Sequence, residues 1–183
     1  MSRARRPNRR HFLTTLAAAG GATMMPARRA RASTRSATRR LDFRHLHTGE
    51  SLSIDYAVEG RYEPDALAAV NRLLRDFRTG DEHPIDPHLL DVLHALAGRL
   101  ETRRSFEVIS GYRSPATNAA LRRRSDGVAA HSLHMVGQAI DIRVGGVALT
   151  HVRNAALELK AGGVGYYPAS NFVHVDTGRV RRW

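Results

Sequence analysis

A stretch near the middle of the chain, AHSLHMVGQAIDIRV at 130–144, restricts the possible fold more than any other. After Gly137, whose missing side chain allows a tight bend, residues alternate as in a β-strand with one buried face. In such a strand Ile140 and Ile142 point to the core, whereas Asp141 points to the opposite face. The stretch therefore predicts a core strand that carries a carboxylate on its non-core face.

A second strand of the same kind is predicted from SNFVHVDTG at 170–178. Its valines face the core, and Phe172, His174 and Asp176 lie on the opposite face. If the two strands are neighbours in a sheet, His174 and Asp141 can share one coordination sphere, which His134 can reach from the turn. Two imidazoles and one carboxylate leave a fourth tetrahedral position for water, which is the pattern of a catalytic zinc site. His and Asp side chains also meet by chance, so the spacing by itself leaves metal binding open.

The formal charge of +12 over 183 residues is typical of a nucleic-acid-binding protein, but its distribution argues against that class. Residues 1–32 hold eight arginines and no acid, which leaves about +4 for the rest of the chain. Tight, salt-sensitive nucleic-acid binding by residues 33–183 is therefore not expected. The chain has no cysteine, so disulfides contribute nothing and its stability must come from core packing, to which a bound metal can add.

Residues 1–32 have the order of a twin-arginine export signal. Arg9 and Arg10 precede an apolar run from Phe12 to Met25, and ARA at 30–32 offers a small-x-small cleavage site near Ala32. The run is too short and too rich in Gly, Ala and Thr for a membrane span. The alternative is a basic tail without fixed structure. We expect a mature protein of the bacterial periplasm or cell envelope, with no stable membrane span after cleavage.

The folded domain is expected at residues 41–183, after a polar and flexible lead-in at 33–40. The segment at 40–57 predicts a β-hairpin, and those at 63–78 and 86–101 predict two amphipathic helices that begin near a proline. Further strands are predicted at 105–110, 137–144, 164–168 and 170–178, with helices after Pro115 and at 149–163. This order predicts an α+β domain: a small mixed or antiparallel sheet with flanking helices.

SLHMVGQAID, from Ser132 to Asp141, matches the S-x-H-x-x-G-x-A-x-D signature of the zinc D-Ala-D-Ala carboxypeptidase and endopeptidase family, whose fold is shared with the hedgehog signalling domain. The longer segments SGYRSPATNAALRRRSDGVAAHSLHMVGQAIDIR and RNAALELKAGGVGYYPASNFVHVDTGRVRRW resemble the murein endopeptidase K branch of that family. The similarity covers roughly residues 41–183 and is densest from Ser110 onward. It implies a hedgehog-like fold and zinc-dependent hydrolysis of an amide in peptidoglycan peptides.

The resemblance also implies roles for individual residues. His134 and Asp141 match the first two zinc ligands, and His174 in FVHVD matches the third. Arg113 in SGYRS matches the arginine that faces the scissile carbonyl or the substrate carboxylate. A guanidinium suits this role because it is always charged and can hold the negative charge that develops on a tetrahedral oxygen.

The general base is where this sequence departs from the wider family, which usually has Glu or Asp three residues before the last zinc histidine. Asn171 occupies that position. Asp176 can accept a proton from bound water, hold the His174 ring, or cap the turn that follows. His131 can supply an imidazole instead, and zinc-bound hydroxide without a strong base is a third alternative.

We therefore expect a monomeric, exported zinc metallopeptidase that cleaves a cross-link between stem peptides, either diaminopimelate to diaminopimelate or D-alanine to diaminopimelate. Two alternatives remain: a D-Ala-D-Ala carboxypeptidase, and a cell-wall-binding domain that holds zinc without catalysis, which the missing acid at 171 would permit. Tyr166, Tyr167 and Phe172 are expected in the core more than in a peptide groove, and Trp183 is expected to pack against the domain without a chemical role.

Overall fold

The computed structural model describes residues 38–183 with the exception of residue 126. The export signal expected at 1–32, and most of the lead-in expected at 33–40, lie outside the described residues. Among the residues that are described, no helix has both the length and the apolar character needed to cross a membrane.

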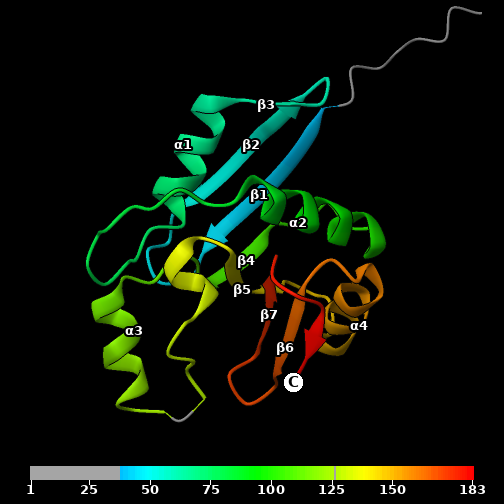
Figure 1. Ribbon diagram of the computed structural model, residues 1–183. Coiled ribbons are helices and arrows are strands. Elements are labelled where there is room, and N and C mark those ends of the chain that lie inside the picture. The colour runs from blue at the N-terminus through cyan, green and yellow to red at the C-terminus, as the bar shows by residue number, and fades with distance from the viewer. Residues whose placement is uncertain (1–37, 126) are drawn as a thin grey trace, which may run out of the picture. The chain divides into compact units, whose positions relative to one another are not determined.

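An open eight-stranded sheet runs through the domain, in the strand order β3-β2-β1-β4-β5-β7-β6-β8 (Figure 1). Two neighbouring pairs, β1 with β4 and β6 with β8, are parallel, and the other pairs are antiparallel. The sheet is therefore mixed, and the predicted α+β class is confirmed. The strands are β1 Arg39–His45, β2 Ser51–Val58, β3 Arg61–Tyr62, β4 Phe106–Ser110, β5 Ala139–Val144, β6 Gly163–Tyr167, β7 Phe172–Asp176 and β8 Arg181–Arg182.

The two edge strands, β3 and β8, were not expected from the sequence. Each has two residues, which is too short for an alternating pattern to be recognised. β8 nevertheless matters for the site, because its pairing with β6 holds Trp183 against the sheet: the Tyr166 N–H donates to the Trp183 carbonyl at 3.1 Å.

Four α-helices are present within the described residues: α1 Pro64–Leu73, α2 Pro87–Arg99, α3 Pro115–Arg122 and α4 Leu149–Leu159. The first three begin with the expected proline, and Ser114 caps α3 by accepting from the Thr117 N–H at 3.2 Å. α1 ends at Leu73, earlier than the predicted helix at 63–78. The reason is a tight turn after it, in which the Asp76 side chain accepts from the backbone N–H of Arg78 at 3.1 Å.

The apolar faces of β5 and β7 form the centre of the core, as the alternation predicts. Ile140, Ile142 and Val173 are fully buried, and Val175 is nearly so. α4 packs against β5, β6 and β7, while α2 packs against α4 and β1 (Figure 1). With each large aliphatic side chain worth about 1.5–3 kcal/mol when buried, this face anchors the two strands that carry the site on their other side.

Candidate metal centre and active site

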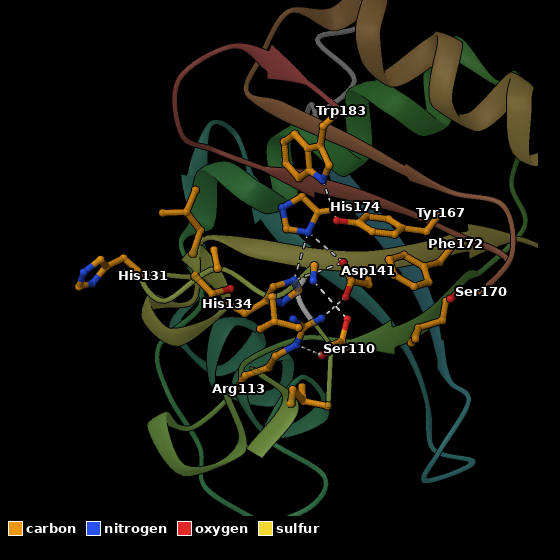
Figure 2. Close-up of a pocket in the computed structure, with 18 of the residues that line it drawn as sticks. Ser110, Arg113, His131, His134, Asp141, Tyr167, Ser170, Phe172, His174 and Trp183 are labelled. Carbon is orange, nitrogen blue, oxygen red and sulfur yellow. Dashed lines mark hydrogen bonds and ion pairs between the residues drawn. The ribbon is translucent and has the colours of Figure 1, made fainter. Parts of the chain in front are cut away.

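The non-core faces of β5 and β7 bring two candidate ligands together. The strands pair antiparallel, and Asp141 stands directly opposite His174 in the register. Side chains in such a pair lie close enough to interact, and Oδ1 of Asp141 is 2.9 Å from Nδ1 of His174 (Figure 2). The two predicted strands are therefore neighbours, as a shared site requires.

His134 comes from a short 3-10 turn, Leu133–Val136, that leads into β5. Gly137 ends this turn with a φ of 68°, in the left-handed region. A Cβ at this position would lie only 2.1 Å from the Pro84 carbonyl oxygen, so a larger residue is excluded by space as well as by backbone angle. The turn places Nε2 of His134 at 3.2 Å from Oδ1 of Asp141 and 3.1 Å from Nδ1 of His174.

The outer nitrogens of both imidazoles contact acceptors, which defines the tautomers. Nδ1 of His134 lies 2.6 Å from the Gly111 carbonyl oxygen, and Nε2 of His174 lies 3.1 Å from Oδ2 of Asp176. A carbonyl or carboxylate oxygen can only accept, so these nitrogens carry the hydrogens. The inner nitrogens then present lone pairs to Asp141. Three acceptors thus converge on one point, which is favourable when a cation lies between them.

The spacing of the three ligand atoms fits zinc. Their pairwise separations lie between 2.9 and 3.2 Å. A tetrahedral zinc ion with bonds of about 2.0–2.1 Å holds its ligands about 3.3 Å apart, so small outward movements are enough to admit it. Across the described part of the chain, His134, Asp141 and His174 are the one group of three or more such side chains with the spacing of metal ligands.

Burial and neighbouring charges determine how the ligands ionise. Burial lowers the pKa of His134, and this outweighs the nearby Asp141 carboxylate. Burial alone would raise the pKa of Asp141, but His134, His174 and Arg113 together hold it well below its usual range. Burial would lower the pKa of His174, yet the Asp141 and Asp176 carboxylates on either side raise it. A bound cation would act on His174 in the opposite direction, favouring the unprotonated ring.

Asp176 lies behind the His174 ring and is fully buried. Its carboxylate accepts from the backbone N–H groups of Gly163 and Gly178, each at 2.9 Å, and from both terminal nitrogens of Arg181 at 3.1 and 2.7 Å. Burial alone would raise its pKa, but the hydrogen bonds from His174 and Arg181 hold it well below the usual range. With both oxygens so engaged, the geometry favours the ring-holding role over the general base.

Arg113 lies between β4 and α3 and points toward the ligands (Figure 2). One terminal nitrogen donates to Oδ2 of Asp141, and Nε donates to the Ser110 hydroxyl at 2.8 Å. The Arg113 backbone N–H also donates to the His134 carbonyl at 3.2 Å. Ser110 was not singled out from the sequence, although it opens the same SGYRS motif. These contacts keep one guanidinium beside the metal ligands.

The ligands and Arg113 open onto a pocket of about 540 Å³ whose opposite wall is aromatic (Figure 2). The rings of Tyr167 and Phe172 stack at 4.6 Å, and Nε1 of Trp183 donates to the Tyr167 hydroxyl at 2.7 Å. The Trp183 ring lies 5.2 Å from that of His174, and the residue as a whole is 49% exposed. The expectation of a core position is therefore wrong for Tyr167 and Phe172, which line the pocket. Trp183 packs against the domain as expected, and it also lines the pocket.

The remaining two positions considered for the base lie away from the ligands. His131 is exposed and lines the pocket, but Figure 2 shows its ring pointing away from the three ligands. Asn171 is exposed in the turn before β7, with a φ of 54°, and is outside the set of residues that line the pocket. The position at which the wider family carries its acid therefore precedes the strand here.

Comparison with known proteins gives a consistent set of relatives. Residues 33–183 match the family model described as peptidoglycan L,D-endopeptidase MepK. The Escherichia coli K12 protein named peptidoglycan L,D-endopeptidase MepK is 46% identical over 176 residues, which cover 96% of this chain and 97% of that protein. The Haemophilus influenzae protein named probable peptidoglycan L,D-endopeptidase MepK is 42% identical over 177 residues, covering 96% and 95%.

Proposed function

Since the chain belongs to the peptidoglycan L,D-endopeptidase MepK family, we propose that it is a zinc-dependent murein endopeptidase that hydrolyses cross-links between peptidoglycan stem peptides. The observation that carries the zinc assignment is the convergence of three lone-pair atoms, from His134, Asp141 and His174, at separations of 2.9 to 3.2 Å. These atoms belong to a single chain and border one pocket, which supports action as a monomer.

The bond is proposed to be the diaminopimelate to diaminopimelate cross-link. The relatives are named L,D-endopeptidases, which describes a bond between an L-centre and a D-centre. In this cross-link the carboxyl of an L-centre is joined to the amine of a D-centre. The alternative left open by the sequence, D-alanine to diaminopimelate, joins two D-centres and so fits the relatives' names less well.

The proposed mechanism assigns a task to each side chain around the ligands. Zinc, when bound, lowers the pKa of a water molecule to about 7 and polarises the scissile carbonyl. Arg113 lines the pocket beside Asp141 and is placed to donate to the negative charge that develops on the carbonyl oxygen. Its contact with Asp141 also keeps that carboxylate turned toward the two imidazoles. Gly111 and Asp176 hold the His134 and His174 rings in the orientation that exposes a lone pair.

The group that accepts the proton of the attacking water is proposed to be an imidazole. The alternative is that zinc-bound hydroxide attacks without a dedicated base. Asp141 is the one acid among the described residues that line the pocket, and it is already assigned as a ligand. Two further imidazoles line the pocket, His131 and His47. Burial lowers the pKa of His47, and Arg78 adds to this, which favours the neutral form of the ring that can accept a proton. His131→Gln and His47→Gln therefore test the step, read as turnover at saturating zinc.

The place of action is proposed to be the periplasm or cell envelope, reached through the twin-arginine signal at 1–32. Peptidoglycan lies outside the cytoplasmic membrane, so an enzyme that acts on it must be exported. A lysine pair in place of Arg9 and Arg10 should keep the protein in the cytoplasm, as measured by fractionation, because that export route requires the arginine pair.

Digestion of purified sacculi by residues 33–183 tests the proposed function. The products are identified by mass, with and without a chelator, and with Asp141→Ala as the inactive control. The expected result is loss of diaminopimelate to diaminopimelate dimers, stopped by chelator and restored by added zinc. A rate unchanged by chelator would overturn the zinc mechanism.

Two other results would point to the alternatives raised by the sequence. Release of terminal D-alanine with the dimers left intact would identify a carboxypeptidase. Stoichiometric zinc with every cross-linked muropeptide intact would identify a binding domain.

A further inference from the structure

Three arginines line the pocket: Arg113, Arg181, which is paired with Asp176, and Arg78, which comes from a part of the chain far from the motifs of the site. Arg78 lies in the turn after α1 and lines the pocket together with Arg113. The turn is held by the buried Asp76, whose carboxylate accepts from the Ser114 N–H at 2.9 Å, the Ser114 hydroxyl at 2.8 Å and the Arg78 N–H at 3.1 Å. Arg78 is therefore fixed to the start of α3, next to Arg113.

The Arg78 side chain is held in place by an aromatic stack. Its guanidinium carbon lies 4.1 Å from the centre of the Phe77 ring, and the Phe77 ring stacks on His47 at 4.2 Å with an interplanar angle of 11°. His47 also lines the pocket. Stacking on an aromatic face restricts the motion of a guanidinium but leaves its N–H groups available for hydrogen bonds. The Arg78 side chain therefore loses little conformational entropy when a ligand binds.

The positive charge of Arg78 has no direct counterion within the described residues. None of the ion pairs there involves it. One oxygen of the nearby Asp76 accepts twice from Ser114, and the other accepts from the Arg78 backbone N–H. Arg113 differs, because it contacts Asp141. Burial lowers the pKa of Arg78, the nearby Asp76 carboxylate opposes this, and the charge of Arg113 adds to the lowering. Two neighbouring cations, one of them without a counterion, make this side of the pocket a site for an anion.

The substrate of the proposed function carries a suitable anion next to the bond that is cut. In a cross-link to diaminopimelate, the scissile nitrogen belongs to the amine of a D-centre, and the same carbon bears a free carboxylate. A planar carboxylate is the group that a guanidinium binds through two parallel hydrogen bonds.

On the basis of the proposed function, we propose that Arg78 is a specificity-determining residue that binds the free carboxylate on the carbon attached to the scissile nitrogen. Arg113 then remains with Asp141 and the scissile carbonyl, and the two arginines divide the recognition of the two sides of the amide. The site accordingly prefers a free carboxylate over a carboxamide at that carbon.

A pair of synthetic cross-linked peptides, identical except for a carboxylate or a carboxamide on that carbon, tests the proposal. The unaltered enzyme is expected to cleave the carboxylate form with a kcat/KM about 10 to 100 times higher. Arg78→Met is expected to lose that preference, mainly through a higher KM for the carboxylate form, with the zinc content unchanged. Arg78→Lys should restore part of it, because it keeps the charge but not the planar fork. Arg122→Met is the control, since Arg122 is exposed on α3 outside the pocket.

Persistence of the preference in Arg78→Met, or an equal loss on both substrates, would overturn the proposal. Calorimetric binding of the leaving fragment, as free acid and as amide, separates this result from failure of the proposed function. If no peptide is cleaved but the acid binds more tightly in an Arg78-dependent way, the subsite stands and the endopeptidase assignment falls. Equal binding of the acid and the amide fragment to the unaltered protein would refute the proposed carboxylate subsite, whatever the result of the cleavage assay.

Discussion

The two faces of β5 and β7 share the same backbone and the same register but have opposite chemistry. One face carries Ile140, Ile142 and Val173 in the core, and the other carries Asp141 and His174. Both faces are buried, so burial alone does not distinguish the site from the core. The difference lies in how the buried groups are satisfied: the apolar face needs only close packing, whereas each polar atom of the other face needs a partner.

That requirement explains why each polar side chain on this face is hydrogen-bonded by further protein groups behind it. The imidazoles of His134 and His174 each have one nitrogen hydrogen-bonded to the protein, which leaves the other for the metal. Asp176 behind His174 is in turn satisfied by two backbone N–H groups and Arg181. A buried polar group is costly without partners, so a metal site on this face depends on the shell that supports it.

Under the proposed zinc assignment, removal of a ligand should have the largest effect, because the side chains that remain no longer hold the cation. His134→Ala, Asp141→Ala and His174→Ala should each lose stoichiometric zinc and reduce sacculus digestion by at least about 10³-fold. Elemental analysis and product masses measure the two effects. His88→Ala is the control, because this side chain lies exposed at the start of α2. Retention of stoichiometric zinc in two of the three variants would refute the ligand assignment.

A cavity on the apolar face should affect stability rather than zinc. Ile142→Ala removes buried atoms from a position that is 0% exposed and should lower the free energy of unfolding by about 2–5 kcal/mol. Chemical denaturation measures the loss, and zinc stoichiometry below the transition should remain one. Val180→Ala, at a position 63% exposed, should change stability by less than about 0.5 kcal/mol. Loss of zinc from folded Ile142→Ala would show that the two faces are not independent.

Asp176→Asn should separate ring holding from proton transfer. As a positioning change it should weaken zinc binding by about 10- to 100-fold and leave most turnover once zinc is saturating. A general base would instead show a turnover loss of about 10² to 10⁴ that zinc cannot restore. Competition with a chelator of known affinity gives the binding constant. Asp91→Asn is a matched control, because Asp91 pairs with Arg39 and lies outside the residues that line the pocket.

His45 offers a smaller effect that sharpens the contrast between satisfied and unsatisfied imidazoles. It is fully buried, its Nδ1 accepts from the His47 N–H at 3.2 Å, and its Nε2 has no partner in the described part of the structure. Burial, with smaller contributions from His47 and Arg75, lowers its pKa to about 4. The unfolded chain, with a histidine pKa near 6.5, therefore takes up the proton first as the pH falls.

Stability from His45 should thus be complete above about pH 6.5 and fall as the pH approaches 4, by about 1 kcal/mol between pH 7 and 5.5. Denaturation across this range measures the slope. His45→Asn should flatten the slope, because an amide can accept the same backbone hydrogen bond without titrating. His88→Gln, a change on the exposed surface, should not. An unchanged slope in His45→Asn would assign the dependence to another group.

The local pattern of the sequence predicts the helices, the strands other than the two short edge strands β3 and β8, and the two faces. Alternation in β5 and β7 separates Ile140 and Val173 from Asp141 and His174, and prolines mark the starts of three helices. Such features depend on side-chain periodicity and backbone preference within a few residues, so they can be recognised without the fold. The assignment of His134, Asp141 and His174 as metal ligands rests on the resemblance of the surrounding motif to the family signature. The spacing of these residues in the sequence does not by itself decide whether they bind a metal.

Only the tertiary structure decides which strands are neighbours and what lies behind each ligand. The pairing of Asp141 with His174, the partners of Asp176 and the arrival of Arg78 at the pocket all join segments distant in sequence. Trp183 reaches the pocket through β8, whose two residues show no recognisable period. The physical reason is that strand register and the packing of helices on the sheet are determined by the burial of whole faces against one another. That burial free energy depends on segments distant in sequence, so no short stretch can reveal it.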